Sequence, residues 1–254
     1  MKIISWNVNG LHSRLDAVNR LADKIQPDIM CFQKVRSKGC FIINMPGYMG
    51  WLGPMNDGLF GGVSTYLRNG LKFDFKSQRN DIPKWLLETT CINVIHFEKF
   101  ILVNAYFPYA NAGNKEFVKI RQRWDYEFHD YILKLTKQKP VILCGDLNIV
   151  SEPIDAWDGV NIKNAGCFFP WEHRNFKSMV KQARLVDTYR QLHPNKQEFS
   201  YFFQNRPEYI LENKGFRIDY MLVDEELMPY VTKSEIMTEV TDVDSRPLLL
   251  DINI

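Results

Sequence analysis

Short runs of β-branched and aromatic residues recur along the whole chain, and helical segments lie between them. The clearest runs are bounded by Gly, Pro or Asp and cover residues 2–8, 28–33, 61–67, 140–147 and 216–223. Residues 91–107 indicate two strands joined by a turn at Glu98–Lys99, and residues 235–240 and 247–254 indicate two more at the end of the chain. Strands and helices that mix from end to end predict an α/β fold in which sheets are layered with helices.

Apolar residues at helical spacing mark the helices. Residues 14–25 and 116–138 each carry one apolar stripe, and residues 172–183 and 187–192 predict shorter helices. No internal repeat, low-complexity tract or Ser/Pro linker interrupts this pattern. A chain of 254 residues fits one large domain or two small ones. We therefore predict a single domain over residues 1–254.

Composition sets wide bounds on the partners. Apolar residues make up 45% of the chain and charged residues 24%, which is ordinary for a globular protein with a large core. The net charge of +2 permits a polyanionic partner without requiring one. No apolar run approaches the ~18 residues of a membrane span, so no membrane partner is expected.

The cysteines bear on the compartment. Their number is odd and none forms a CxxC pair, which predicts buried, reduced thiols in an intracellular protein. The apolar run after Lys2 is too short for a signal peptide. Nuclear, mitochondrial and cytoplasmic locations all stay open. The five cysteines are Cys31, Cys40, Cys91, Cys144 and Cys167.

Polar side chains stand at the ends of several predicted strands, where a plain core strand would not need them. Taken alone, Asn7 or Asn148 is a turn-former and Asp219 a satisfied structural acid. Taken together they indicate a site, because strand ends on one edge of an α/β domain are where sites form. Carboxylates and amides in such a cluster suit Mg²⁺. The set comprises Asn7, Tyr106, Asp146, Asn148, Asp219, Asp242 and Asp244.

Blocks that occur in one order along nearly the whole chain resemble the exonuclease III family of apurinic/apyrimidinic (AP) endonucleases. These blocks are KIISWNVNGL, QPDIMCFQ, GGV, NAYFPYANAG, RQRWD, KPVILCGDLNIV, EPID, NAG, VDTYRQLHP, GFRIDYMLV and a closing D-x-x-P. The resemblance implies a four-layer α/β sandwich, two packed mixed β-sheets flanked by helices. It also implies a Mg²⁺-dependent phosphodiesterase that cuts DNA 5′ to an abasic site.

The resemblance also implies roles for the polar residues. Asn7 is then a site residue near the metal, and Tyr106 contacts the scissile phosphate. Asp146 orients and activates the attacking water with Asn148 beside it, while Asp219 belongs to the floor of the site. Asp244 is the acid that would orient a histidine.

Two departures from the family pattern change the predicted chemistry. The family has Glu, its principal metal ligand, after the CFQ block, and this chain has Lys34. The family's closing block reads Ser-Asp-His, whereas this chain reads Val243-Asp244-Ser245 and continues with Arg246. An ammonium group close to a metal-binding position weakens the binding of a cation. A serine hydroxyl cannot replace an imidazole, and the loss of a general acid or base costs ~10²–10⁴ in rate.

These departures favour an AP-endonuclease-like protein with a degraded catalytic centre, one that is not an efficient enzyme. It would act by binding DNA or RNA, or a protein partner. An active Mg²⁺- or Mn²⁺-dependent AP endonuclease or 3′-exonuclease of base excision repair is one alternative, and a structural subunit with a vestigial groove is another. Lys34 would form an ion pair with a remaining acid or lie solvated at the rim. The predicted nucleic-acid-binding residues are Asn148, Arg246, Lys34 and Phe216, and the remaining metal ligands are Asn7 and Asp244.

Overall fold

The computed structural model describes residues 1–36, 42–52, 61–74, 82–89, 91–157, 165–203, 205–240 and 244–254. Cys40 and Asp242 therefore lie outside the described residues. The other cysteines are free and buried, as the sequence predicts. In the described part of the chain, no helix is long and apolar enough to cross a membrane.

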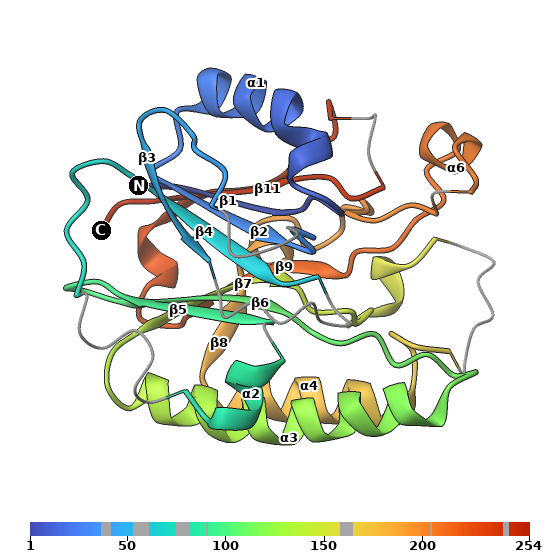
Figure 1. Ribbon diagram of the computed structural model, residues 1–254. Helices are drawn as coiled ribbons and strands as arrows, with labels where there is room; N and C mark the ends of the chain where they lie inside the picture. The colour runs from blue at the N-terminus through green and yellow to red at the C-terminus, as the bar shows by residue number, and fades with distance from the viewer. Residues whose placement is uncertain are drawn as a thin grey trace.

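Within those ranges, two mixed β-sheets face each other (Figure 1). One sheet has the strand order β10-β11-β1-β2-β4-β3, and the other has the order β5-β6-β7-β9-β8. The strands of the first sheet are β1 (Lys2–Asn7), β2 (Ile29–Gln33), β3 (Tyr48–Leu52), β4 (Val63–Arg68), β10 (Val231–Ile236) and β11 (Leu248–Ile252). Those of the second are β5 (Ile92–His96), β6 (Ile101–Tyr106), β7 (Val141–Asp146), β8 (Leu185–Asp187) and β9 (Asp219–Asp224).

Helices cover the outer face of each sheet. Helix α1 (Leu15–Ile25) packs Val18 and Leu21 against the first sheet, while α3 (Lys115–Thr136) and α4 (Pro170–Gln182) cover the second (Figure 1). The predicted four-layer sandwich is confirmed, because each helix buries an apolar stripe against one sheet. Three shorter helices are α2 (Lys84–Glu88), α5 (Thr188–Leu192) and α6 (Glu208–Leu211).

The layer between the sheets is largely apolar, with a group of buried amides beneath the edge that carries the polar strand ends. There Gln33 on β2 donates from Nε2 to Asn104 Oδ1 on β6 at 2.8 Å. Asn104 in turn donates to the carbonyl of Ser64 on β4 at 2.9 Å. Both amides are fully buried, so this amide bridge joins the two sheets where water does not compete.

The polar strand ends meet at this edge because of the strand directions. β1 runs parallel to β2 and pairs Asn7 with Gln33, and β6 runs parallel to β7 and pairs Tyr106 with Asp146. β9 is antiparallel to β7 and brings Asp219 opposite Asp146. Three neighbouring strands of the second sheet thus present their polar residues side by side.

Gly145 allows β6 and β7 to approach closely at this point. Its φ is +139°, and a Cβ there would stand 1.8 Å from the carbonyl oxygen of Ala105. Only glycine tolerates both conditions. The glycine therefore sets the spacing between the strands that carry Tyr106 and Asp146.

Some elements differ from their predicted ranges. β9 begins at Asp219 and not at Phe216, because Phe216 makes isolated bridges to Ala156 and Tyr201 instead. β10 occupies residues 231–236, whereas the prediction was 235–240, because the ladder with β11 runs from Val231 to Ile236. The short elements β3, β8, α2 and α6 were not predicted.

Candidate functional site

Asn7 and Asp146 join the two sheets at the shared edge. Asn7 Nδ2 donates to Asp146 Oδ2 at 2.8 Å, and both side chains are buried. The other carboxylate oxygen, Oδ1, accepts the backbone N–H of Asn148 at 3.0 Å. Burial raises the pKa of Asp146 above its usual range, although Lys34 and these hydrogen bonds act in the opposite direction.

Asn148 and Tyr106 lie against this carboxylate. Asn148 has a φ of +46°, a left-handed conformation that asparagine tolerates better than most residues. Its side-chain amide donates to the carbonyl of Phe107 at 2.7 Å. Tyr106 is buried, and desolvation raises the pKa of its hydroxyl well above the usual value. Its hydroxyl is therefore a neutral hydrogen-bonding group at this edge.

Asp219 is the second buried acid of the site. Ser200 Oγ donates to Asp219 Oδ2 at 2.6 Å. Burial raises the pKa of Asp219 well above its usual range, and the nearby Asp146 charge raises it further. Two adjacent buried carboxyl groups favour retention of a proton by the pair.

Lys34 is held close to these acids. It follows β2 directly, has a left-handed φ of +49°, and its carbonyl accepts the N–H of Gly10 at 2.8 Å. Its ammonium lies 5.0 Å from the ring centroid of Tyr106, and its charge lowers the pKa of both Asp146 and Asp219. Among the described residues it forms no ion pair at contact distance. Lys34 is half-buried over an aromatic ring, which is neither the predicted ion pair nor a solvated rim position.

Ser245 is buried at the position where the family pattern has histidine. Its carbonyl accepts Trp6 Nε1 at 2.7 Å, while its hydroxyl has no hydrogen-bond partner among the residues that the structure describes. The adjacent Asp244 is half-buried and accepts Asn9 Nδ2 at 3.1 Å. Asn9 therefore bonds one oxygen of the carboxylate that would orient an imidazole.

Arg246 and Phe216 are buried like most of the other predicted residues, but each packs against a phenylalanine ring. The guanidinium of Arg246 lies 4.5 Å from the ring centroid of Phe202 and is nearly buried, which lowers its pKa. Phe216 is buried beside Phe203, with ring centroids 5.4 Å apart.

The donor set of this site does not fit a divalent cation as it stands. In the described part of the chain, no three His, Cys, Asp or Glu side chains are grouped so that they could hold a metal. Both oxygens of Asp146 accept internal hydrogen bonds, and Asn7 Oδ1 accepts the N–H of Asn9 at 3.2 Å. Mg²⁺ demands several oxygen ligands, and the Lys34 charge opposes it.

Arg121 holds the backbone that follows Asp146. This fully buried residue of α3 donates to the carbonyls of Pro108, Leu147 and Asn148 at 3.0–3.1 Å. It also donates to Asp125 Oδ1 at 2.7 Å. In the sequence this pair is part of the RQRWD block, from which no role could be predicted.

Glu172 lies next to Arg121 and carries a shifted pKa. Its Oε1 is 3.6 Å from Arg121 Nη1. Burial raises its pKa from 4.5 to about 7, although Arg121 opposes the shift. The folded protein therefore binds this proton more tightly than the unfolded chain does.

We expect the Glu172→Gln variant to change how stability depends on pH. Because the pKa of Glu172 is raised in the folded state, its bound proton stabilises the fold. This contribution is full below pH ~4.5 and is lost as pH rises through ~7. Between pH 5 and pH 8, the free energy of unfolding of the variant should therefore rise by about 1–3 kcal/mol relative to that of the wild type. Urea unfolding at both pH values measures this gain. Glu226→Gln, at an exposed position, is the control, and equal pH slopes for wild type and Glu172→Gln would refute the expectation.

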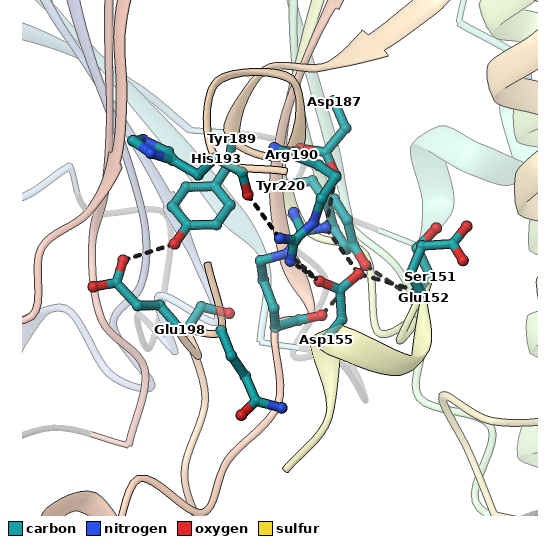
Figure 2. A network of polar contacts seen from close by, with 12 residues as sticks. Ser151, Glu152, Asp155, Asp187, Tyr189, Arg190, His193, Glu198 and Tyr220 are labelled. Atoms are coloured by element: carbon teal, nitrogen blue, oxygen red, sulfur yellow. Dashed lines mark hydrogen bonds and ion pairs between the residues drawn. The ribbon is translucent and has the colours of Figure 1, made fainter. Parts of the chain in front are cut away.

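A largely buried ionic cluster lies next to the segment that leads into Asp219, and Figure 2 shows Asp155 at its centre. Arg217 donates to Asp155 Oδ1 and Oδ2 at 2.8 and 2.9 Å and to Asp187 at 2.7 Å. Arg190 donates to Asp155 Oδ1 at 2.5 Å. We call Asp155, Asp187, Arg190 and Arg217 the Asp155 cluster. It ties the loop after β7 to α5 and to the segment that leads into Asp219.

Comparison with known proteins identifies the relationship. The family model described as "Endonuclease/Exonuclease/phosphatase family" matches residues 4–242. The chain belongs to this family. "Recombination repair protein 1" of Drosophila melanogaster is 31% identical over 100% of the chain, which spans 37% of that protein's length. "DNA-(apurinic or apyrimidinic site) endonuclease" of Dictyostelium discoideum is 30% identical over 100% of the chain and 71% of its own length.

Solved structures agree with the fold. An AP endonuclease from Archaeoglobus fulgidus superimposes with a TM-score of 0.87 at 21% identity and 100% coverage of both chains. These matches confirm the resemblance to AP endonucleases of the exonuclease III type and the sandwich fold. The roles of the individual site residues in this family member stay predictions.

Several residues at the edge of the site had no signal in the sequence. Ser200 and Tyr201 lie in loops without a recognisable motif, and only the fold brings them beside the acids; Asn9 lies within the KIISWNVNGL block, but its contact with Asp244 was not predicted. Gln33 and Asn104 appeared within the quoted blocks, but nothing in their spacing indicated a bridge between sheets.

Proposed function

We propose that residues 1–254 form one AP-endonuclease-like domain whose metal-dependent cleavage is strongly reduced and which binds nucleic acid at the shared sheet edge. The observation that carries the proposal is Lys34, whose ammonium lies over Tyr106 and acts on the charges of Asp146 and Asp219. A resident cation at this place opposes a divalent ion and attracts a phosphate.

The surroundings of Ser245 support the loss of cleavage. Its buried hydroxyl is uncharged near neutral pH, and Asn9 bonds Asp244 where an imidazole would need that carboxylate. The loss of a general acid or base costs ~10²–10⁴ in rate, and the loss of a transition-state donor ~10²–10³. Because groups that act together are not additive, we expect a combined loss of roughly 10⁴.

A working enzyme is the second candidate, and one observation favours it. Asn7, Asp146, Asn148 and Tyr106 keep a connected arrangement of hydrogen bonds and short contacts. If that set is sufficient with Mg²⁺ or Mn²⁺, the protein is a DNA phosphodiesterase. The two candidates differ in the rate at which an abasic duplex is cut.

The test measures cleavage and binding on the same duplex with one abasic analogue. We expect the wild type with Mg²⁺ or Mn²⁺ to cut roughly 10⁴-fold more slowly than the Dictyostelium relative assayed in parallel. Cleavage at a comparable rate would end the proposal in favour of the working enzyme.

A binding measurement distinguishes a nucleic-acid-binding protein from two alternatives. These are a structural subunit with a vestigial groove and a protein that binds only a protein partner. We expect measurable binding without metal that weakens as salt rises. Lys34→Gln should lower the slope of log K against log salt by about one, since one phosphate contact is lost. Lys24→Gln, at an exposed position on α1, should leave the slope unchanged. A wild type that does not bind contradicts this part of the proposal.

A further inference from the structure

Five aromatic side chains form a continuous strip that starts at the candidate site. Phe203 lies at its middle, with its ring centroid 5.4 Å from Phe216, 5.9 Å from Tyr201 and 6.1 Å from Tyr209. Tyr209 on α6 in turn lies 6.1 Å from Trp157. We call Tyr201, Phe203, Phe216, Tyr209 and Trp157 the aromatic strip.

The inner end of the strip adjoins the acids and Lys34. Tyr201 makes backbone bridges to Phe216 and to Ser245, which places it beside Asp244. Lys34, Asp244 and Asp146 all act on its hydroxyl, and burial raises its pKa to about 12. The strip is therefore continuous with the edge that we propose binds phosphate.

The outer end combines exposed apolar surface with a cation. Lys214 Nζ lies 5.6 Å from the ring centroid of Trp157 and 5.5 Å from that of Tyr209, although Glu212 pairs with it. Leu211, two residues beyond Tyr209, is 91% exposed, and α6 projects from the body of the molecule (Figure 1).

Trp157, Tyr201 and Phe203 pack against a small buried cluster that includes Phe216, and neighbouring rings of the strip meet edge to face or tilted. Phe216 is buried, but Tyr201, Phe203, Tyr209 and Trp157 each keep part of their surface exposed. A run of half-exposed rings between Lys34 at one end and Lys214 at the other combines stacking surfaces with positive charge. Nucleic-acid-binding proteins stack successive bases on aromatic rings while basic groups follow the backbone.

We propose that the aromatic strip stacks the bases of a single-stranded nucleic-acid segment whose phosphates approach Lys34. This inference rests on the proposed function and adds a substrate preference to it, for unpaired nucleotides next to the phosphate site. Stacking on an aromatic ring contributes about 1–3 kcal/mol per base and tolerates any sequence. The strip thus recognises bases and not only backbone.

The experiment compares two probes of equal length that differ only in their bases. One is a labelled oligothymidylate, and the other is an oligomer with the same phosphodiester backbone in which every nucleotide is abasic. We expect Tyr209→Leu and Trp157→Leu to weaken binding of the oligothymidylate about 5–100-fold and to leave binding of the abasic oligomer unchanged. Tyr209→Phe keeps the ring and should bind like the wild type.

The controls separate this inference from the proposed function. Tyr126→Leu removes a ring that is 68% exposed on α3 and should change neither probe. If the wild type binds both probes and Tyr209→Leu and Trp157→Leu bind oligothymidylate as the wild type does, the strip is refuted while the proposed function stands. If the wild type binds neither probe, both fail. Thermal unfolding of each variant confirms that the fold is kept.

Discussion

The double variant Lys34→Glu plus Ser245→His is expected to cut an abasic duplex at least ~10²-fold faster than the wild type when Mg²⁺ is present. The glutamate replaces a cation with an oxygen ligand beside Asp146 and Asp219, on which the Lys34 charge now acts. The histidine supplies the imidazole that Ser245 lacks and places it next to Asp244. Both changes act on transition-state charge, so the expected effect is large.

Each single variant isolates one half of this argument. Lys34→Glu alone should raise the affinity for Mg²⁺, which appears as a rise in unfolding temperature with added metal that the wild type does not show. Ser245→His alone should change the rate little while the ammonium remains. Because Ser245 is buried, the unfolding temperature of its variant also reports any overpacking.

A matched variant guards against an effect of net charge. Lys24→Glu changes the charge by the same two units on the exposed surface of α1 and should not accelerate cleavage. The charge argument fails if Lys34→Glu shows no response to Mg²⁺ and the double variant, still folded, cuts no faster than the wild type.

Asp155→Asn is expected to destabilise the fold by about 3–5 kcal/mol. Asp155 is fully buried and bonds both Arg217 and Arg190, so the substitution leaves two guanidinium groups without their shared anion. Asp187 still contacts the side chain of Arg217, but it contacts Arg190 only through the backbone N–H of that residue. For a chain of this size, the loss corresponds to a fall in unfolding temperature of roughly 10 °C.

Urea unfolding at low temperature measures the loss of stability even if the variant is only marginally stable at room temperature. Glu239→Gln removes one partner of the exposed Lys24 pair and should cost less than about 1 kcal/mol. A loss below 1 kcal/mol for Asp155→Asn would show that the Asp155 cluster contributes little to stability.

The sequence predicted the layers and the edge of the site because both follow from local patterns. Apolar stripes on residues 14–25 and 116–138 identified the helices, and polar residues after strands identified Asn7, Tyr106 and Asp146. Parallel pairing of β1 with β2 and of β6 with β7 then brings those ends together. A period of two residues in strands and of 3.6 residues in helices shows directly which side chains share a face.

What the sequence did not predict depends on contacts between distant segments. Lys34 was expected to pair with an acid or lie at the rim, but Asp146 already accepts bonds from Asn7 and Asn148. The ammonium instead lies over Tyr106. The Asp155 cluster joins residues 62 positions apart, and no local pattern marks such a pairing. Helix α6, with four residues, is too short for a periodic signal.

The amide bridge between Gln33 and Asn104 bears on what substitutions at this edge can change. It joins the two sheets beneath the acids of the site. Neither the Lys34 ammonium nor the Ser245 hydroxyl takes part in it. The two substituted side chains, Lys34 and Ser245, therefore do not hold the sheets together. Substitutions at those two positions can therefore change the chemistry of this edge without loosening the attachment between the sheets.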